Sequence, residues 1–237
     1  MDDIQFGDMQ EATPERSLRP DRDAHFAVVP YENPVAGELP IFIDLDVLRD
    51  MEEHARSDKT VELGGVLLGG QYHDEQGQPF VVITDSLRAE HYESTKGSFK
   101  FTHETWSQIN RQRNEFSPEL QMVGWYHTHP DWGVFLSGMD MFICDHFFNR
   151  PLDVAYVIDP CRGDRACFQW TGNPRERVKR TGGYYIMASR YRAAELAHSV
   201  AQLQAGADAM PNDPRFSSHA GHSAPVVNVS QPAANPL

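Results

Sequence analysis

Residues 123–140, with the sequence VGWYHTHPDWGVFLSGMD, constrain the fold more than any other part of the chain. The first residues are β-branched and aromatic, which predicts a strand that leads into His127 and His129. Residues i and i+2 of a strand project from the same face, so both imidazoles can point at one spot. Pro130 ends the pairing because it has no N–H to donate to a neighbouring strand.

A helix is expected to begin shortly after this turn. Ser137 can cap it, and Asp140 falls in its first turn, where a negative charge suits the helix dipole. Helical side chains lean toward the N-terminus, which aims Asp140 back at the two histidines. Two imidazoles and one carboxylate, with a fourth position left for water, are typical of a catalytic rather than a structural zinc site.

Each part of this pattern also has a simpler interpretation. Ser137 and Asp140 fit an ordinary helix cap, and two histidines two residues apart are often unrelated side chains. The combination favours a metal site, because the strand, the proline, the capping serine and the acid follow one another in the order that such a site needs.

One acid upstream is a candidate catalytic base. Residues 61–70, VELGGVLLGG, are apolar and glycine-rich and contain Glu62 as their single charge. The run predicts a buried strand over residues 61–68, in which an unpaired carboxylate would be costly. Glu62 therefore either lies at the strand end in solvent or has a partner inside a site, and the run alone favours solvent.

Together, Glu62, the HTHP sequence of residues 127–130, and Ser137 and Asp140 in the pattern S-x-x-D resemble the JAMM motif of the MPN (JAB) metalloproteases. The surrounding sequence is most similar to the proteasome-lid and signalosome isopeptidases, and the similarity runs over about residues 41–172. All five functional positions match, which argues against the metal-free scaffold members of the family.

The resemblance implies an α/β fold of the MPN type (JAB, cytidine-deaminase-like), with a mixed, mostly antiparallel curved sheet flanked by helices. It implies one Zn²⁺ ion on His127, His129 and Asp140, with Glu62 as general base and acid and Ser137 stabilising the oxyanion. The expected activity is that of a zinc metallopeptidase, a deubiquitinase-like isopeptidase that cuts after the tail of ubiquitin or a ubiquitin-like protein.

Two alternative functions stay open. One is a JAB peptidase that acts on the tail of a sulfur-carrier protein, and the other is a non-catalytic MPN scaffold. Some family members act only with a partner subunit, and the acidic surface is compatible with one here. The resemblance implies that residues 86–101 form a flap that can pair with the substrate tail. Alternatively, these residues form an ordinary solvated connection. Trp132 and Phe135 either form an apolar rim that binds substrate or pack on the core.

Domain organisation follows from local composition. Residues 1–39 are predicted to be an N-terminal extension, residues 40–206 the catalytic domain, and residues 207–237 a disordered tail rich in proline, asparagine, serine and alanine. Helices are expected from a cap at Asp44, from a cap at Thr102, over residues 139–149 and over residues 189–205, with strands over residues 79–84, 119–126, 153–158 and 166–170.

Composition excludes several functional classes. The net charge of −13 argues against nucleic-acid binding, and no apolar run reaches membrane-spanning length. The three cysteines, Cys144, Cys161 and Cys167, are too few and too irregular for a disulfide framework. They are expected to be reduced thiols in or near the core, which together with the acidic N-terminus predicts a cytoplasmic protein.

Overall fold

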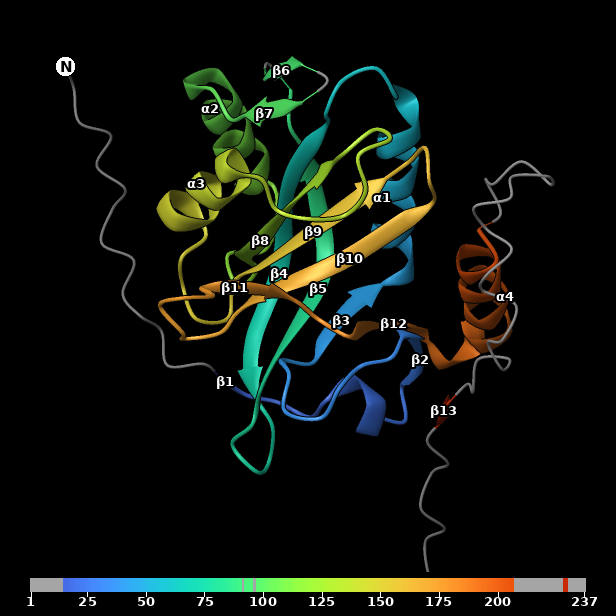
Figure 1. Cartoon of the computed structure of the whole chain (residues 1–237). Coiled ribbons are helices and arrows are strands. Elements are labelled where there is room, and N and C mark those ends of the chain that lie inside the picture. The colour runs from blue at the N-terminus through green and yellow to red at the C-terminus, as the bar shows by residue number, and fades with distance from the viewer. Residues whose placement is uncertain (1–14, 91, 96, 207–227, 230–237) are drawn as a thin grey trace, which may run out of the picture.

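The computed structural model describes residues 15–90, 92–95, 97–206 and 228–229 of the 237-residue chain (Figure 1). Its α-helices are α1 (Leu45–Ser57), α2 (His103–Arg113), α3 (Gly138–Phe147) and α4 (Ala193–Gln204), with short 3-10 helices η1 (Pro20–Arg22) and η2 (Arg190–Arg192). Its strands are β1 (Glu15–Arg16), β2 (Phe26–Glu32), β3 (Ile41–Asp44), β4 (Gly64–His73), β5 (Pro79–Arg88), β6 (Glu93–Thr95), β7 (Ser98–Lys100), β8 (Gln121–Thr128), β9 (Val154–Asp159), β10 (Asp164–Trp170), β11 (Val178–Arg180), β12 (Gly183–Ser189) and β13 (Asn228–Val229).

Most of these strands form one mixed sheet. The order is β11-β10-β9-β8-β4-β5-β3-β12-β2-β13, with β1 beside β4, and β6 and β7 form a separate hairpin. The pairs β8/β9, β3/β5, β3/β12 and β1/β4 are parallel, and the remaining pairs are antiparallel. The predicted α/β fold with a mixed, mostly antiparallel curved sheet and flanking helices is confirmed (Figure 1).

The two faces of the sheet are covered by different helices. Tyr126 of β8 belongs to a buried core with residues of α1 and α4, whereas Trp125 belongs to a second core with residues of α2 and α3. Successive strand residues point to opposite faces, so His127 lies on the same face as Trp125. The strand that carries the histidines therefore meets the helix that carries Asp140 on one side of the sheet.

Polar side chains begin three of the four α-helices as the sequence predicts. The Asp44 side chain accepts a hydrogen bond from the Asp46 N–H at the start of α1. Thr102 caps α2 and Ser137 caps α3, each through a reciprocal capping box. Such caps satisfy backbone donors that have no partner inside the helix, which is why residue type alone located these three helix starts.

The predicted start of the strand at residue 61 is wrong, because β4 begins at Gly64. The residues before it bond elsewhere: the Glu62 N–H donates to the Thr95 carbonyl at 3.1 Å, and the Leu63 N–H donates to the Thr128 hydroxyl oxygen at 2.8 Å. Glu62 is thus held between the β6–β7 hairpin and the end of β8 rather than inside the ladder.

Part of the predicted N-terminal extension is built into the sheet. All seven residues of β2 pair with β12, and Ala27 and Val29 are fully buried. The division of the chain at residue 40 stays a prediction. The predicted disordered tail lies outside the described residues except for Asn228–Val229, which pair with β2.

Two of the three cysteines are buried. Cys144 and Cys167 are buried as expected, but Cys161 is exposed, because it lies in the turn between β9 and β10 rather than in a strand. Within the described part of the chain, no helix is both long and apolar enough to span a membrane. The predicted cytoplasmic location stays a prediction.

His54 of α1 is buried beneath β8 and has an unusual protonation equilibrium. Burial, together with the nearby Arg88 guanidinium, lowers its pKa to about 4. Its Nδ1 lies 2.8 Å from the Tyr126 hydroxyl, whose own pKa is raised by burial. The hydroxyl therefore keeps its proton and forms a hydrogen bond with the neutral imidazole.

We expect acid to destabilise the chain through His54. The unfolded imidazole takes up a proton near its ordinary pKa of 6.5, and the folded one only near 4, so this contribution is present above pH 6.5 and is lost as the pH falls to 4. Between pH 7 and pH 4 the wild type should lose about 1–2 kcal/mol more than His54→Gln, after allowance for solvent screening. Urea unfolding at both pH values measures this difference, and identical losses in the two proteins would contradict it.

Candidate metal centre

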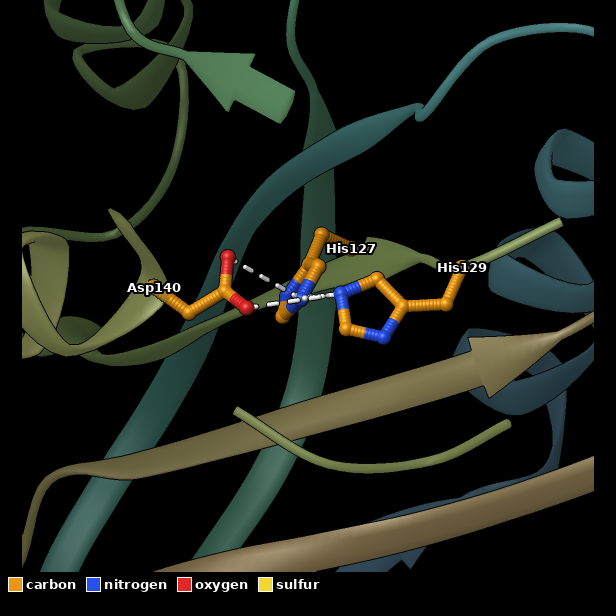
Figure 2. A group of neighbouring side chains, drawn as sticks. All are labelled: His127, His129 and Asp140. Atoms are coloured by element: carbon orange, nitrogen blue, oxygen red, sulfur yellow. Dashed lines mark hydrogen bonds and ion pairs between the residues drawn. The ribbon is translucent and has the colours of Figure 1, made fainter. Parts of the chain in front are cut away.

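Three side chains from separate positions in the sequence meet at one point (Figure 2). His127, His129 and Asp140 are all buried and offer ligand atoms that lie within 4.8 Å of one another. The two histidine Nε2 atoms are 3.0 Å apart. The Asp140 carboxylate oxygens lie 3.4 Å from Nε2 of His127 and 3.3 Å from Nε2 of His129. The structure thus brings together the three residues that the sequence predicts as metal ligands.

The local structure explains this convergence. His127 is the seventh residue of β8, and the His129 N–H continues the pairing by donating to the Ile158 carbonyl at 2.9 Å. Asp140 lies in the first turn of α3, where its Oδ2 accepts the Ser137 N–H at 2.6 Å. The capping interpretation and the ligand interpretation of Asp140 are therefore compatible, since the cap aims the carboxylate at the histidines.

The donor atoms fit a divalent cation. His129 Nδ1 is 3.2 Å from the Gly133 carbonyl oxygen, so this nitrogen carries the proton and Nε2 presents a lone pair to the site. Two imidazole nitrogens and a carboxylate face one another at 3.0–3.4 Å, which is unfavourable unless a proton or a cation lies between them. Two nitrogens and one oxygen are a ligand set that suits zinc.

The protonation equilibria of the three groups agree with this geometry. Burial lowers the pKa of His127, which keeps it neutral. Burial raises the pKa of Asp140, but the charges and hydrogen bonds of the two histidines outweigh it and hold that pKa well below its usual range. Burial lowers the pKa of His129, but Asp140 and Glu62 raise it by more. The pKa of His129 is therefore above its ordinary value. Both anions thus favour positive charge at this point.

Glu62 is buried beside this cluster, not in solvent as its local sequence favoured. Its side chain is 4% exposed. Its pKa is raised to about 7, chiefly by burial. The His129 charge opposes this rise, and the Asp140 charge adds to it. The backbone supports this placement, because Gly64 pairs with His127 and the Thr128 N–H donates to the Leu63 carbonyl at 2.8 Å, which brings Glu62 opposite His129. Among the described residues none donates a hydrogen bond to it, so it is available to exchange a proton with a bound molecule.

The remaining predicted residues border the cluster. The Ser137 hydroxyl oxygen accepts the Asp140 N–H at 3.2 Å, which leaves its own hydrogen free to donate. Phe135 is 40% exposed and its ring lies 4.6 Å from that of His129, whereas Trp132 is 53% exposed. Both aromatic side chains are on the surface rather than in the core, and their predicted role in substrate binding stays a prediction.

Sequence reasoning missed one contact of the first histidine. The His127 ring stacks on Trp125, with centroids 4.3 Å apart and planes within 9°, and its buried Nδ1 has no hydrogen-bond partner in the described chain. Stacking therefore orients His127, whereas a carbonyl orients His129. The spacing of two residues on one strand could have revealed this neighbour, because such residues share a face.

Comparison with known families agrees with the geometry. Residues 39–149 match the family model described as JAB1/Mov34/MPN/PAD-1 ubiquitin protease. The chain contains a JAB/MPN domain. Its homologues include COP9 signalosome complex subunit 5 of Drosophila melanogaster, which is 32% identical over 117 residues, and of Neurospora crassa, which is 33% identical over 149 residues.

These alignments cover 48% of this chain and 35% of the fly protein, and 60% of this chain and 43% of the fungal protein. The chain thus spans less than half the length of these curated relatives. A solution structure of a Desulfitobacterium hafniense protein aligns with a TM-score of 0.45 and 16% identity, covering 59% of this chain and 88% of that one.

Proposed function

We propose that this chain is a zinc-dependent isopeptidase that hydrolyses the amide bond after the C-terminal tail of ubiquitin or a ubiquitin-like protein. The observation that carries the proposal is the buried Glu62 carboxyl beside the convergent His127, His129 and Asp140 in a JAB/MPN domain. Zinc held by these three ligands would act as a Lewis acid that acidifies a water molecule and polarises the substrate carbonyl.

Glu62 is the proposed general base and acid. With a pKa of about 7, its carboxyl is available in both protonation states near neutral pH. It accepts a proton from the attacking water as the new carbon–oxygen bond forms. It then returns that proton to the leaving amine as the carbon–nitrogen bond breaks. The lack of a competing hydrogen bond to the carboxyl in the described chain supports this role.

Ser137 is the proposed oxyanion donor. Its oxygen is held by the Asp140 N–H, so the hydroxyl hydrogen can turn toward the carbonyl oxygen as negative charge develops there. A single preorganised donor of this kind is typically worth about 3–4 kcal/mol of transition-state stabilisation. Asp140 therefore serves both as a metal ligand and as the group that fixes Ser137.

The β6–β7 hairpin and two aromatic side chains are proposed to receive the substrate tail. The hairpin holds the Glu62 backbone through the Thr95 carbonyl and the Ser94 hydroxyl. Trp132 approaches the hairpin turn, with ring atoms 3.8 Å from the position that a Cβ would take at Gly97. An extended tail that runs along the edge of the hairpin, beside Trp132, could add a strand to it, with main-chain hydrogen bonds providing affinity.

Cleavage of a panel of substrates tests this function. Purified chain is incubated with ubiquitin and ubiquitin-like proteins joined to a reporter by an isopeptide bond, before and after treatment with a zinc chelator, and after zinc is restored. We expect cleavage after the tail that stops with chelator and returns with zinc. A sulfur-carrier protein with a C-terminal extension is included, and its exclusive cleavage would replace the proposed substrate class.

Absence of cleavage, together with absence of bound zinc in the purified chain, would leave the scaffold role. A partner subunit remains part of the proposal, because the relatives are named as subunits of a complex and are more than twice as long as the matched region. The acidic composition, with a net charge of −13, is compatible with a partner that presents a basic surface.

A further inference from the structure

Asp159, outside the predicted motif, ends strand β9 next to the metal ligands. Because β9 runs parallel to β8, the two strands end at the same edge of the sheet, with Thr128 paired to Ile158. Asp159 is fully buried. A buried carboxylate requires partners that compensate its loss of water, so its contacts indicate what it does.

The Asp159 carboxylate joins two loops through backbone N–H groups. Within its own turn, Oδ1 accepts the Cys161 N–H at 2.9 Å and the Arg162 N–H at 3.1 Å. From the loop that follows His129, Oδ1 accepts the Asp131 N–H at 3.0 Å and Oδ2 accepts the Gly133 N–H at 2.7 Å. Hydrogen bonds to a charged acceptor are stronger than neutral ones.

The loop after His129 needs this support. Asp131 has φ of 66° and Gly133 has φ of 84°, so two residues of one short loop adopt the left-handed conformation, which is strained for aspartate. Arg162 contributes from the surface: its Nε is 3.1 Å from an Asp131 carboxylate oxygen, and its NH2 group donates to the Asp131 carbonyl at 2.6 Å.

The fixed loop in turn sets the orientation of one ligand. Gly133 links Asp159 to this ligand. Its N–H donates to Asp159, and its carbonyl oxygen is 3.2 Å from His129 Nδ1. We propose that Asp159 is a positioning residue for the metal site, which acts through Gly133 to hold the His129 ring and its tautomer. This inference rests on the proposed zinc site, but not on the identity of the substrate.

His129 depends on this device because it lies beyond the end of β8. His127 is part of the strand and stacks on Trp125, so its orientation does not require the loop. Loss of Asp159 should therefore alter one ligand of three. Loss of a group that orients a metal ligand from outside the coordination sphere typically weakens metal binding about 10-fold to 100-fold. Asp159 reaches His129 only through Gly133, so we expect an effect at the lower end of this range.

The test compares Asp159→Asn with Asp153→Asn as the matched control. Asp153 is also a buried aspartate next to β9, but at the other end of the strand, where it accepts hydrogen bonds from Arg150 and Gln71. Zinc affinity is measured by competition with a chromophoric chelator, and the visible spectrum of the cobalt-loaded protein reports the ligand geometry. We expect zinc binding about 10-fold weaker and a changed cobalt spectrum in Asp159→Asn, and wild-type values for both in Asp153→Asn.

Arg162→Gln is the second variant, because the exposed Arg162 side chain pairs with both Asp131 and, at 3.5 Å, Asp159 Oδ2, while its loss retains the backbone hydrogen bonds that Asp159 accepts. We expect a smaller weakening of zinc binding, about threefold. If both Asp159→Asn and Arg162→Gln bind zinc as tightly as wild type, or if a poorly folded Asp159→Asn is accompanied by an unaffected Arg162→Gln, the inference is overturned.

The outcome also separates this inference from the proposed function. A wild-type chain that binds no zinc would remove both. A chain that binds zinc but cleaves no substrate, with weakened binding in Asp159→Asn, would refute the isopeptidase activity and support the positioning role. Equal zinc affinity in all variants alongside wild-type cleavage would refute the positioning role alone.

Discussion

Glu62→Gln is expected to lower kcat on an isopeptide substrate by about 10²–10⁴-fold, the range that a general acid–base group typically contributes. Glutamine has nearly the same shape as glutamate but cannot take a proton from water or return it to the amine. The three proposed metal ligands are unchanged, so the zinc content of the purified variant should equal that of wild type. Turnover and zinc content are measured on the same preparation.

The same substitution should increase the stability of the zinc-free chain at pH 8. Burial raises the pKa of Glu62 from the ordinary 4.5 to about 7, so the folded state binds a proton more tightly than the unfolded state. Its contribution to stability is therefore present below pH 4.5 and is lost as the pH rises through 7. Above that range the folded chain contains a poorly solvated charge, and glutamine removes it. A higher Tm together with lost turnover would separate a catalytic group from a structural one.

Glu75→Gln is the matched control, because Glu75 is an exposed acid in the turn between β4 and β5, beyond the opposite end of β4 from Glu62. It should retain the turnover and the Tm of wild type. Wild-type kcat in Glu62→Gln would remove Glu62 from the mechanism, whatever its effect on stability.

His129→Ala is expected to weaken zinc binding by more than about 100-fold, since it removes a ligand rather than a group that orients one. Isopeptidase turnover should fall to background for the same reason. Zinc that binds only the folded state stabilises it by mass action, by about 2.7 kcal/mol when free zinc is 100 times Kd. Chelator should therefore lower the Tm of the wild type and leave that of His129→Ala unchanged.

His146→Ala is the control for this loss. His146 is an exposed histidine on α3, six residues beyond Asp140, and its ring stacks on Phe142 with centroids 4.0 Å apart. Within the described part of the chain its ring contacts Phe142 and not the cluster, so its removal should leave zinc stoichiometry, turnover and the response to chelator as in wild type. Unchanged zinc stoichiometry in His129→Ala would contradict the ligand assignment.

Local sequence patterns predicted the elements that carry the cluster. Caps at Asp44, Thr102 and Ser137 located three helices, because each hydroxyl or carboxylate satisfies donors that every helix leaves free. The run of β-branched and aromatic residues before His127 located β8, which delivers the histidines. These features depend on residues a few positions apart, which is the range over which sequence patterns are informative.

The features that were missed depend on distant parts of the chain. The run around Glu62 favoured solvent, because nothing in it indicates that the residue is buried or that the distant β6–β7 hairpin holds its backbone. The strand β2 was assigned to an extension, although β12, more than 150 residues later, completes its pairing. Asp159 lies outside the predicted motif, and only the parallel pairing of β8 and β9 brings its carboxylate to the loop after His129.

The central claim is that three ligands hold one zinc ion with the Glu62 carboxyl facing it. A crystal structure of the zinc-loaded chain, with anomalous data collected on both sides of the zinc absorption edge, tests this claim most directly. We predict a single anomalous peak between the two Nε2 atoms of His127 and His129 and the Asp140 carboxylate, with the Glu62 carboxyl within hydrogen-bonding distance of the water beside it. No peak at that position, or a Glu62 side chain turned away from it, would contradict the account.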